Sequence, residues 1–195
     1  MHRLSSSFVL GYHDCDQDVG ERLLPRPAFK PSANDYDWLG PGIYFWEANP
    51  QRAHEFAEEV AAREESGIRK PFAIGAVIEM GLCLDLTTST GVDWLRIAHQ
   101  NLFDITQAAG SQFPVNSRNH LRQNLDCAVM QRLHAIMEEP NLPAFDTLKG
   151  VFFEGAPVYP GSGFRDKTHF QIAVRNPDCI KGVFRVPLKK AQPIP

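Results

Sequence analysis

The stretch Asp37-Trp38-Leu39-Gly40-Pro41-Gly42-Ile43-Tyr44-Phe45 leads from a proline-containing loop into a short apolar run. Its two glycines allow backbone angles that other residues avoid, and Pro41 fixes one dihedral angle between them. A tight turn of this kind delivers Tyr44 to a defined position at the start of a strand. Tyr44 is then either an ordinary core residue or one wall of a pocket, and the stretch alone does not decide between the two.

The composition is that of a globular protein. The chain has 195 residues, of which 43% are hydrophobic and 22% charged, with a formal net charge of −3. This length suffices for a single domain over residues 1–195 with a substantial core. The small negative charge excludes a global basic field that would draw the chain to nucleic acid or anionic lipid.

The N-terminus and the cysteines bear on the compartment. The apolar run at residues 8–10 is too short for a signal peptide or a membrane span. The four cysteines are scattered and give neither a CxxC pair nor a metal-ligand spacing. We therefore expect a cytoplasmic protein with free thiols, no metal and no membrane association.

Hydrophobic periodicity and turn residues predict an α+β fold, with strands first, then helices, then strands again. The best local signal is Asn49-Pro50, which is typical of a helix start and predicts a helix that runs to about Gly67. The middle of the chain, about 91–143, is expected to be helical. The expected strands are 8–13, 43–45, 71–80, 82–86, 150–154, 169–174 and 180–186, and the other expected helices are 17–24, 94–105 and 121–136.

Three side chains on or near the ends of expected strands could carry chemistry: His13, Tyr44 and Gln171. Each also has a plain structural interpretation, as a satisfied core histidine, a core tyrosine and a solvent-facing strand residue. Their order along the chain, separated by a proline-containing loop and by helices, is more informative than any one of them.

In that order the sequence resembles the ADP-ribosyltransferase superfamily, in particular its poly(ADP-ribose) polymerase-like branch. Tyr12-His13-Asp14-Cys15 resembles the aromatic-His-Gly-Ser motif of the first core strand, and Leu39 to Phe45 resembles the Gly-x-Gly-Ile-Tyr-Phe segment. Gln171-Ile172-Ala173-Val174 stands where the family has a catalytic Glu. The segment from Gly155 to Val174 is similar to uncharacterised bacterial members of the superfamily. The chain would therefore be a His-Tyr-Gln variant. Relative to the family, the helical middle, about 91–143, would be an insertion.

The resemblance implies a split, mainly antiparallel sheet with flanking helices and a cleft that binds NAD as a substrate. His13 would donate to the adenosine ribose, Tyr44 would stack on the nicotinamide, and Gln171 would face the nicotinamide ribose. The main chain of Asp14 would hold the nicotinamide amide through one donor and one acceptor. The implied catalytic residues are Gln171, His13, Tyr44 and His169, and the implied NAD-binding residues are Tyr12, His13, Asp14, Gly42, Tyr44 and Arg52.

The departures from the family pattern concern the chemistry. Asp14 replaces a Gly, Arg52 stands roughly where a Ser often touches nicotinamide, and Gln171 replaces the catalytic Glu. A glutamine accepts a hydrogen bond from a ribose hydroxyl but carries no charge and cannot act as a base, so chain elongation is not expected. Glu154 and His169 are the candidate substitutes. His169 lies two residues before Gln171 and should point to the same face of its strand.

Other arrangements are weaker. Residues 13–16 (His-Asp-Cys-Asp) could form a metal cluster, but alternate strand residues point to opposite faces, so at most two would converge. Cys15 with a histidine could form a hydrolase pair, although no oriented third member is visible. A late group of basic residues is either a solvated face or a surface that meets phosphate of NAD or of a nucleic acid. These residues are Arg165, Lys167, Arg175, Lys181 and Arg185.

The expected function is that of an NAD-dependent mono-ADP-ribosyltransferase that releases nicotinamide and modifies an unidentified acceptor, such as a protein or nucleic acid. Acceptor choice would lie in residues 155–169 and in the helical middle. A toxin role would fit by association only. The alternatives are a non-catalytic NAD or ADP-ribose binding module, a slow NAD glycohydrolase, and a related transferase acting on RNA phosphate. The transferase acting on RNA phosphate is disfavoured because the first strands show no convergent Arg/His set. The acceptor and the oligomeric state are not specified by the sequence.

Overall fold

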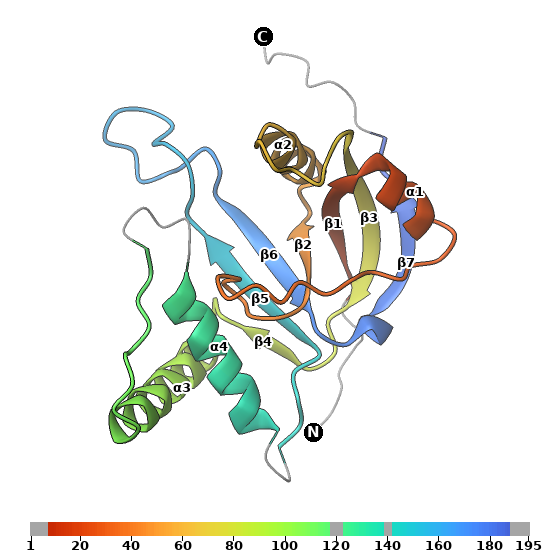
Figure 1. Ribbon diagram of the computed structural model, residues 1–195. Coiled ribbons are helices and arrows are strands. Elements are labelled where there is room, and N and C mark those ends of the chain that lie inside the picture. The colour runs from red at the N-terminus through yellow and green to blue at the C-terminus, as the bar shows by residue number, and fades with distance from the viewer. Residues whose placement is uncertain (1–7, 118–122, 139–141, 188–195) are drawn as a thin grey trace.

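A computed structural model describes residues 8–117, 123–138 and 142–187 of the chain, which form one mixed sheet and helices on both of its faces (Figure 1). The sheet has seven strands in the order β4-β5-β6-β2-β1-β3-β7. All neighbouring strands are antiparallel except β4 and β5. The strands are β1 (Phe8–Asp16), β2 (Ile43–Glu47), β3 (Pro71–Glu79), β4 (Cys83–Asp85), β5 (Thr147–Phe152), β6 (His169–Val174) and β7 (Ile180–Arg185).

Four α-helices and one 3₁₀ helix are found in this part of the chain, namely α1 (Gln17–Leu23), α2 (Pro50–Ala61), α3 (Ser89–Ala108), α4 (Asn124–Met137) and η1 (Pro177–Cys179). Three of the α-helices begin at a side chain that accepts a hydrogen bond from the first turn. Asp16 caps α1, Asn49 caps α2 ahead of Pro50, and Thr88 caps α3. The expected helix start at Asn49-Pro50 is therefore confirmed, because both residues satisfy the geometry of a helix N-terminus.

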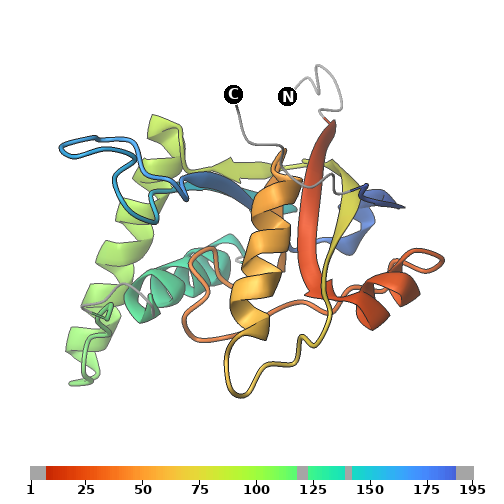
Figure 2. The ribbon, with the colours of Figure 1, turned by 90° about the horizontal axis from the view of Figure 1, so that it is seen from above.

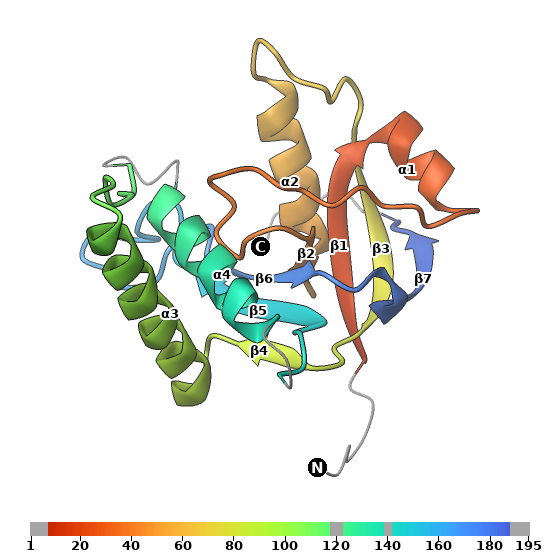
Figure 3. The ribbon, with the colours of Figure 1, turned by 60° about the horizontal axis from the view of Figure 1, so that its bottom comes forward.

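Helices α2, α3 and α4 pack on one face of the sheet. Ala53 of α2 lies against Trp46 and Ala73, while α3 and α4 share a core with Leu148 and Ala173 of β5 and β6. Along the sheet, α3 and α4 lie at one end of the molecule, α1 at the other, and α2 between them (Figures 2 and 3). We call this the α2 face.

The opposite face is covered by α1 and by the loop between α1 and β2. Leu23 of α1 packs with Cys15 and Ile74, and Phe29 of the loop packs against a core that includes Phe45 and Ile172. The loop then passes the end of β2, so that Leu39 lies in the core on the α2 face. The loop therefore connects the two faces just before Tyr44.

The expected elements are present, with different ends. Helix α2 ends at Ala61 rather than near Gly67, because residues 62–70 form turns in which Ser66 bonds to Ile68. Strand β5 begins at Thr147, whose hydroxyl donates to the Met80 carbonyl, and ends at Phe152. The helical middle consists of α3 and α4, and Leu121, the first residue of the predicted second helix, lies outside the described residues. Among the described helices, none has the length and apolar character needed to cross a membrane.

Candidate functional site

The three strands that carry His13, Tyr44 and Gln171 are direct neighbours at the centre of the sheet. β2 lies between β1 and β6 and pairs with both in antiparallel fashion. His13 and Gln171, which are 158 positions apart in the sequence, are thereby brought to strands on either side of β2, each about 5 Å from it in the pairing direction.

The pairing between β1 and β2 stops in the middle of β1. Registered pairs occur only at Gly11↔Glu47 and Tyr12↔Trp46, whereas β1 pairs with β3 along its whole length. The Leu10 carbonyl accepts from the Ala48 amide, so the even-numbered residues of β1 direct their main-chain polar groups toward β2. The main chain of Asp14 therefore faces β2 beyond the point where the ladder ends.

His13 takes the place of the missing ladder bond. Its Nδ1 lies 2.9 Å from the carbonyl oxygen of Tyr44. A carbonyl only accepts, so Nδ1 carries the proton and Nε2 of the neutral ring keeps its lone pair. The ring is half-buried and packs edge-on against Phe29, at 5.3 Å between centroids, and near Phe45 at 5.6 Å.

The side chain of Tyr44 points to the other face of the sheet. Its hydroxyl donates to the Gly40 carbonyl at 2.7 Å and accepts from the Leu39 amide at 3.0 Å. Burial, and next the Asp37 carboxylate, raise the pKa of Tyr44 above its ordinary value. The structure thus joins His13 to the main chain of Tyr44 while the two side chains lie on opposite faces, and it uses the tyrosine hydroxyl to hold a turn.

The glycines of the opening stretch have different structural roles. Gly40 has a φ of 72°, in the left-handed region that favours glycine. Gly42 is buried, and a Cβ there would lie 3.2 Å from the Val174 carbonyl oxygen of β6. Gly42, expected at the NAD site, therefore lies where β2 and β6 pack closely and where a side chain would be crowded.

Gln171 lies on the α2 face, in register with Trp46 of β2 and with Gly150 of β5. Its side chain is half-buried and forms no hydrogen bond to the described residues. An unengaged amide between a large aromatic residue and a glycine is free to bind a ligand.

His169 is on the same face as Gln171, as predicted. It is 4% exposed and lies between Trp46, at 4.3 Å between ring centroids, and Phe152 at 5.6 Å. Its Nδ1 is 2.7 Å from the Lys167 carbonyl, so this nitrogen carries the proton. Burial, with Arg52 adding to it, lowers the pKa of His169 to about 4, and the ring is therefore neutral at pH 7.

Arg52 lies beside this pair as a buried cation. It is 4% exposed, and its guanidinium stacks on Trp46 at 4.9 Å from the ring centroid. Its Nη1 bonds to Glu59 at 2.9 Å, its Nη2 is 3.9 Å from Glu154, and its Nε is buried without a partner in the described part of the chain. Expected only as a replacement for a small polar residue, Arg52 proves to be the buried centre of an ionic cluster whose other members are partly exposed. Sequence order could not reveal this cluster.

Glu154 is the carboxylate of this cluster that makes no hydrogen bond within the described chain. Burial raises its pKa, and the nearby Arg52 opposes the rise. Lys167 instead bonds to Glu59 at 2.8 Å and closes the outer side of the cluster. Glu154 is thus a half-buried carboxylate with free acceptor atoms on the α2 face.

Asp14 and Tyr12 point to the same face. The Asp14 carboxylate accepts from the indole Nε1 of Trp46 at 2.9 Å, and Tyr12 lies edge-on to Phe184 at 6.2 Å. Trp46 therefore contacts or bonds Asp14, Arg52 and His169, which makes it the central residue of the site. No sequence motif had pointed to Trp46 as a site residue.

The late basic residues do not form one patch. Four of them each lie near a carboxylate of a different element, which favours the solvated-face interpretation over a phosphate surface, and Arg165 bonds instead to the Gly155 carbonyl. The four pairs are Lys167–Glu59, Arg175–Glu138, Lys181–Glu79 and Arg185–Glu21.

The weaker arrangements gain no support. Among the described residues, no three His, Cys, Asp or Glu side chains gather as metal ligands would. Cys15 is buried, and burial, with Asp14 and Asp16 adding to it, raises the pKa of its thiol to about 12. A thiol that stays protonated is a poor nucleophile.

Comparison with known proteins identifies one distant relative. The chain is 26% identical over 192 residues to an uncharacterized protein of Methanocaldococcus jannaschii, and the match covers 87% of this chain and 83% of that protein. No family model matches the chain. No solved structure gives a significant match.

Proposed function

We propose that the chain is an NAD-dependent mono-ADP-ribosyltransferase, which transfers ADP-ribose from NAD to an acceptor and releases nicotinamide. The observation that carries the proposal is the early end of the β1–β2 ladder. Beyond the last pair the main chain of Asp14 faces β2 without a registered partner, and we call this interruption of the ladder the gap. It lies beside His13 and Tyr44, the residues on which the family resemblance rests.

The gap suits a carboxamide. The amide group of nicotinamide needs one donor and one acceptor, and the N–H and C=O of Asp14 offer both at a fixed spacing. The Nε2 of His13 carries a lone pair when the ring is neutral, so it accepts from a ribose hydroxyl rather than donating to it. This reverses the direction of the bond that the family resemblance implied for His13.

Gln171 is the residue proposed to face the nicotinamide ribose. Cleavage of the N-glycosidic bond develops positive charge on the ribose, and a hydrogen bond from the 2-hydroxyl to the Gln171 amide oxygen strengthens as that charge forms. The acceptor's nucleophilic atom forms the new bond to the ribose carbon, the bonding pair leaves with nicotinamide, and the acceptor loses a proton. Glu154, whose pKa is raised, is a carboxylate on the α2 face that can take this proton.

The lack of charge at Gln171 favours one alternative, a module that binds NAD or ADP-ribose without turnover. Removing one oriented electrostatic group at a transition state typically costs about 3–4 kcal/mol. The binding module would hold NAD with the same residues as the transferase and would differ from it only in releasing no nicotinamide.

NAD labelled in its nicotinamide separates the two functions. We expect purified protein to release nicotinamide, the variant Gln171→Ala to release it much more slowly, and Gln107→Ala, an exposed glutamine on α3, to match the wild type. Calorimetry with NAD gives the binding constant of each protein. Binding without release across candidate acceptors would support the binding module, and absence of NAD binding would overturn both functions.

A further inference from the structure

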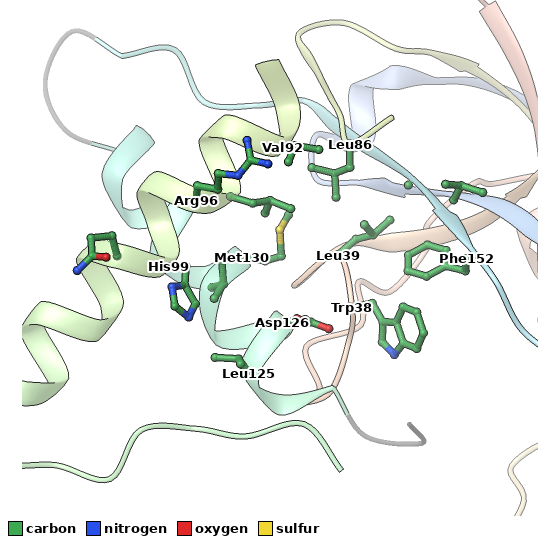
Figure 4. A pocket seen from close by; sticks show the side chains of 15 residues that line it. Trp38, Leu39, Leu86, Val92, Arg96, His99, Leu125, Asp126, Met130 and Phe152 are labelled. Atoms are coloured by element: carbon green, nitrogen blue, oxygen red, sulfur yellow. The ribbon is translucent and has the colours of Figure 1, made fainter. Parts of the chain in front are cut away.

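A cavity of about 630 Å³ lies between α3, α4 and β5, next to the candidate site (Figure 4). Its size falls within the range of about 300–1,000 Å³ that small-molecule sites occupy. Neither the sequence motifs nor the proposed transferase chemistry uses it. Its walls are formed mainly by Trp38, Leu86, Val92, Leu95, Met130 and Phe152.

The walls are apolar and partly aromatic. The rings of Trp38 and Phe152 meet edge to face, at 4.6 Å between centroids. On β5 the lining includes Gly150, whose lack of a side chain makes room for Leu39 and for the ring of Phe152, which a Cβ there would meet at 3.2 and 3.3 Å. Flat surfaces of this kind favour a flat ring system, because stacked or edge-on rings gain about 0.5–1.5 kcal/mol beyond the area they bury.

Polar side chains of the cavity come from the helices. Arg96 bonds to Asp93 at 2.6 Å and Asp126 accepts from Asn116 at 3.0 Å, so both are already engaged. His99 is exposed and forms no hydrogen bond to the described residues, and its ring lies 5.5 Å from that of Phe113. An occupant with one polar group would direct it toward His99, with its apolar body between Trp38 and Met130.

Residues of α3, α4 and β5 line the cavity together with Trp38 and Leu39 of the loop before β2 (Figure 4).

We propose that this cavity is a binding site for a flat, mainly apolar small molecule that carries one hydrogen-bonding group. The inference concerns binding only and goes beyond the transferase function, on which it does not depend. Gly150 is the register partner of Gln171, so the occupant lies one strand away from Gln171 on the same face.

The probe for the test is 2-naphthol, a flat aromatic with one hydroxyl. Val92→Trp fills the cavity from α3, and Val115→Trp makes the same change at a residue that is 70% exposed and outside the lining. We expect calorimetry to show that 2-naphthol binds the wild type and Val115→Trp equally, and that Val92→Trp binds it at least tenfold more weakly. Equal binding by all three proteins, or none by the wild type up to the solubility of the probe, would overturn the proposal.

A second measurement needs no variant and decides the matter if Val92→Trp fails to fold. In NMR spectra of the wild type with 2-naphthol, we expect nuclear Overhauser contacts between the probe and the methyl groups of Met130 and Leu86. Contacts confined to other methyl groups would place the probe elsewhere and contradict the proposal. Because no NAD is present, the outcome is independent of whether the transferase function is correct.

Discussion

The imidazole Nδ1 of His13 lies 2.9 Å from the main-chain carbonyl oxygen of Tyr44, where the next bond of the β1–β2 ladder would otherwise form. A side chain thus replaces a main-chain donor, and the two strands separate beyond it. The bond also fixes the tautomer of His13, with the lone pair on Nε2. One contact therefore maintains the gap at Asp14 and sets the hydrogen-bonding direction of the histidine.

Replacing His13 should test this contact. His13→Ala removes the bond to the Tyr44 carbonyl and the ring packing against Phe29, and we expect the free energy of unfolding to fall by about 1–2 kcal/mol. Urea unfolding followed by circular dichroism measures the change. His99→Ala, at an exposed histidine, should leave stability within about 0.5 kcal/mol of the wild type. Equal stability of the two variants would mean that the His13 bond contributes nothing.

The tyrosine hydroxyl predicts a second stability effect. Tyr44→Phe leaves the Leu39 amide and the Gly40 carbonyl without their partner, which should cost about 1–3 kcal/mol. Tyr159→Phe, at a residue that is 57% exposed, provides the matched control and should be neutral. Urea midpoints of the two variants give the comparison. Since the aromatic ring is retained, a stacking role of Tyr44 further predicts little change in NAD affinity.

Stability should depend on pH through His134 of α4. This side chain is 4% exposed, both ring nitrogens are buried without partners in the described chain, and burial, with Arg175 adding to it, lowers its pKa to about 4. The unfolded state binds the proton near pH 6.5 and the folded state only near pH 4. The neutral His134 therefore leaves the free energy of unfolding at its full value above pH 6.5. This free energy falls by about 3 kcal/mol in all as the pH drops toward 4.

The variant His134→Leu should remove this dependence. Between pH 7 and pH 5 we expect it to lose about 2 kcal/mol less than the wild type in urea unfolding, and it should be more stable at pH 7 because no unpaired polar group remains. The pKa of His169 is also lowered, so this residue makes both proteins lose stability as the pH falls, and its contribution cancels in the comparison. His99→Leu should follow the wild type, and a His134→Leu variant with the wild-type slope would contradict the buried, neutral state of His134.

Much of the fold follows from local sequence signals. The Asn49-Pro50 start of α2 and the apolar runs of β3 and β6 were predicted because caps and periodicity act within a few residues. The end of α2 and the start of β5 were not, because they depend on contacts such as the Thr147 bond to Met80, which lies 67 residues away in the sequence.

The site was predicted less completely than the fold. Strand alternation correctly places His169 and Gln171 on one face, since both lie on the same strand. It does not relate His13 to Tyr44, whose side chains diverge, because the register between strands is not a local property. The ionic cluster around Arg52 was missed for the same reason, because its carboxylates come from α2 and from the segment that follows β5.

The strongest test of the transferase proposal is to restore the charge at Gln171. Gln171→Glu places a carboxylate beside Trp46 on the α2 face, where the proposed ribose develops positive charge, and we expect nicotinamide release from NAD to rise by about 10–100-fold. The effect should fall on kcat, because the added attraction exists mainly in the transition state. Gln107→Glu adds the same charge at an exposed position of α3 and should change nothing. If Gln171→Glu binds NAD but releases nicotinamide no faster than the wild type, Gln171 does not face the reacting ribose.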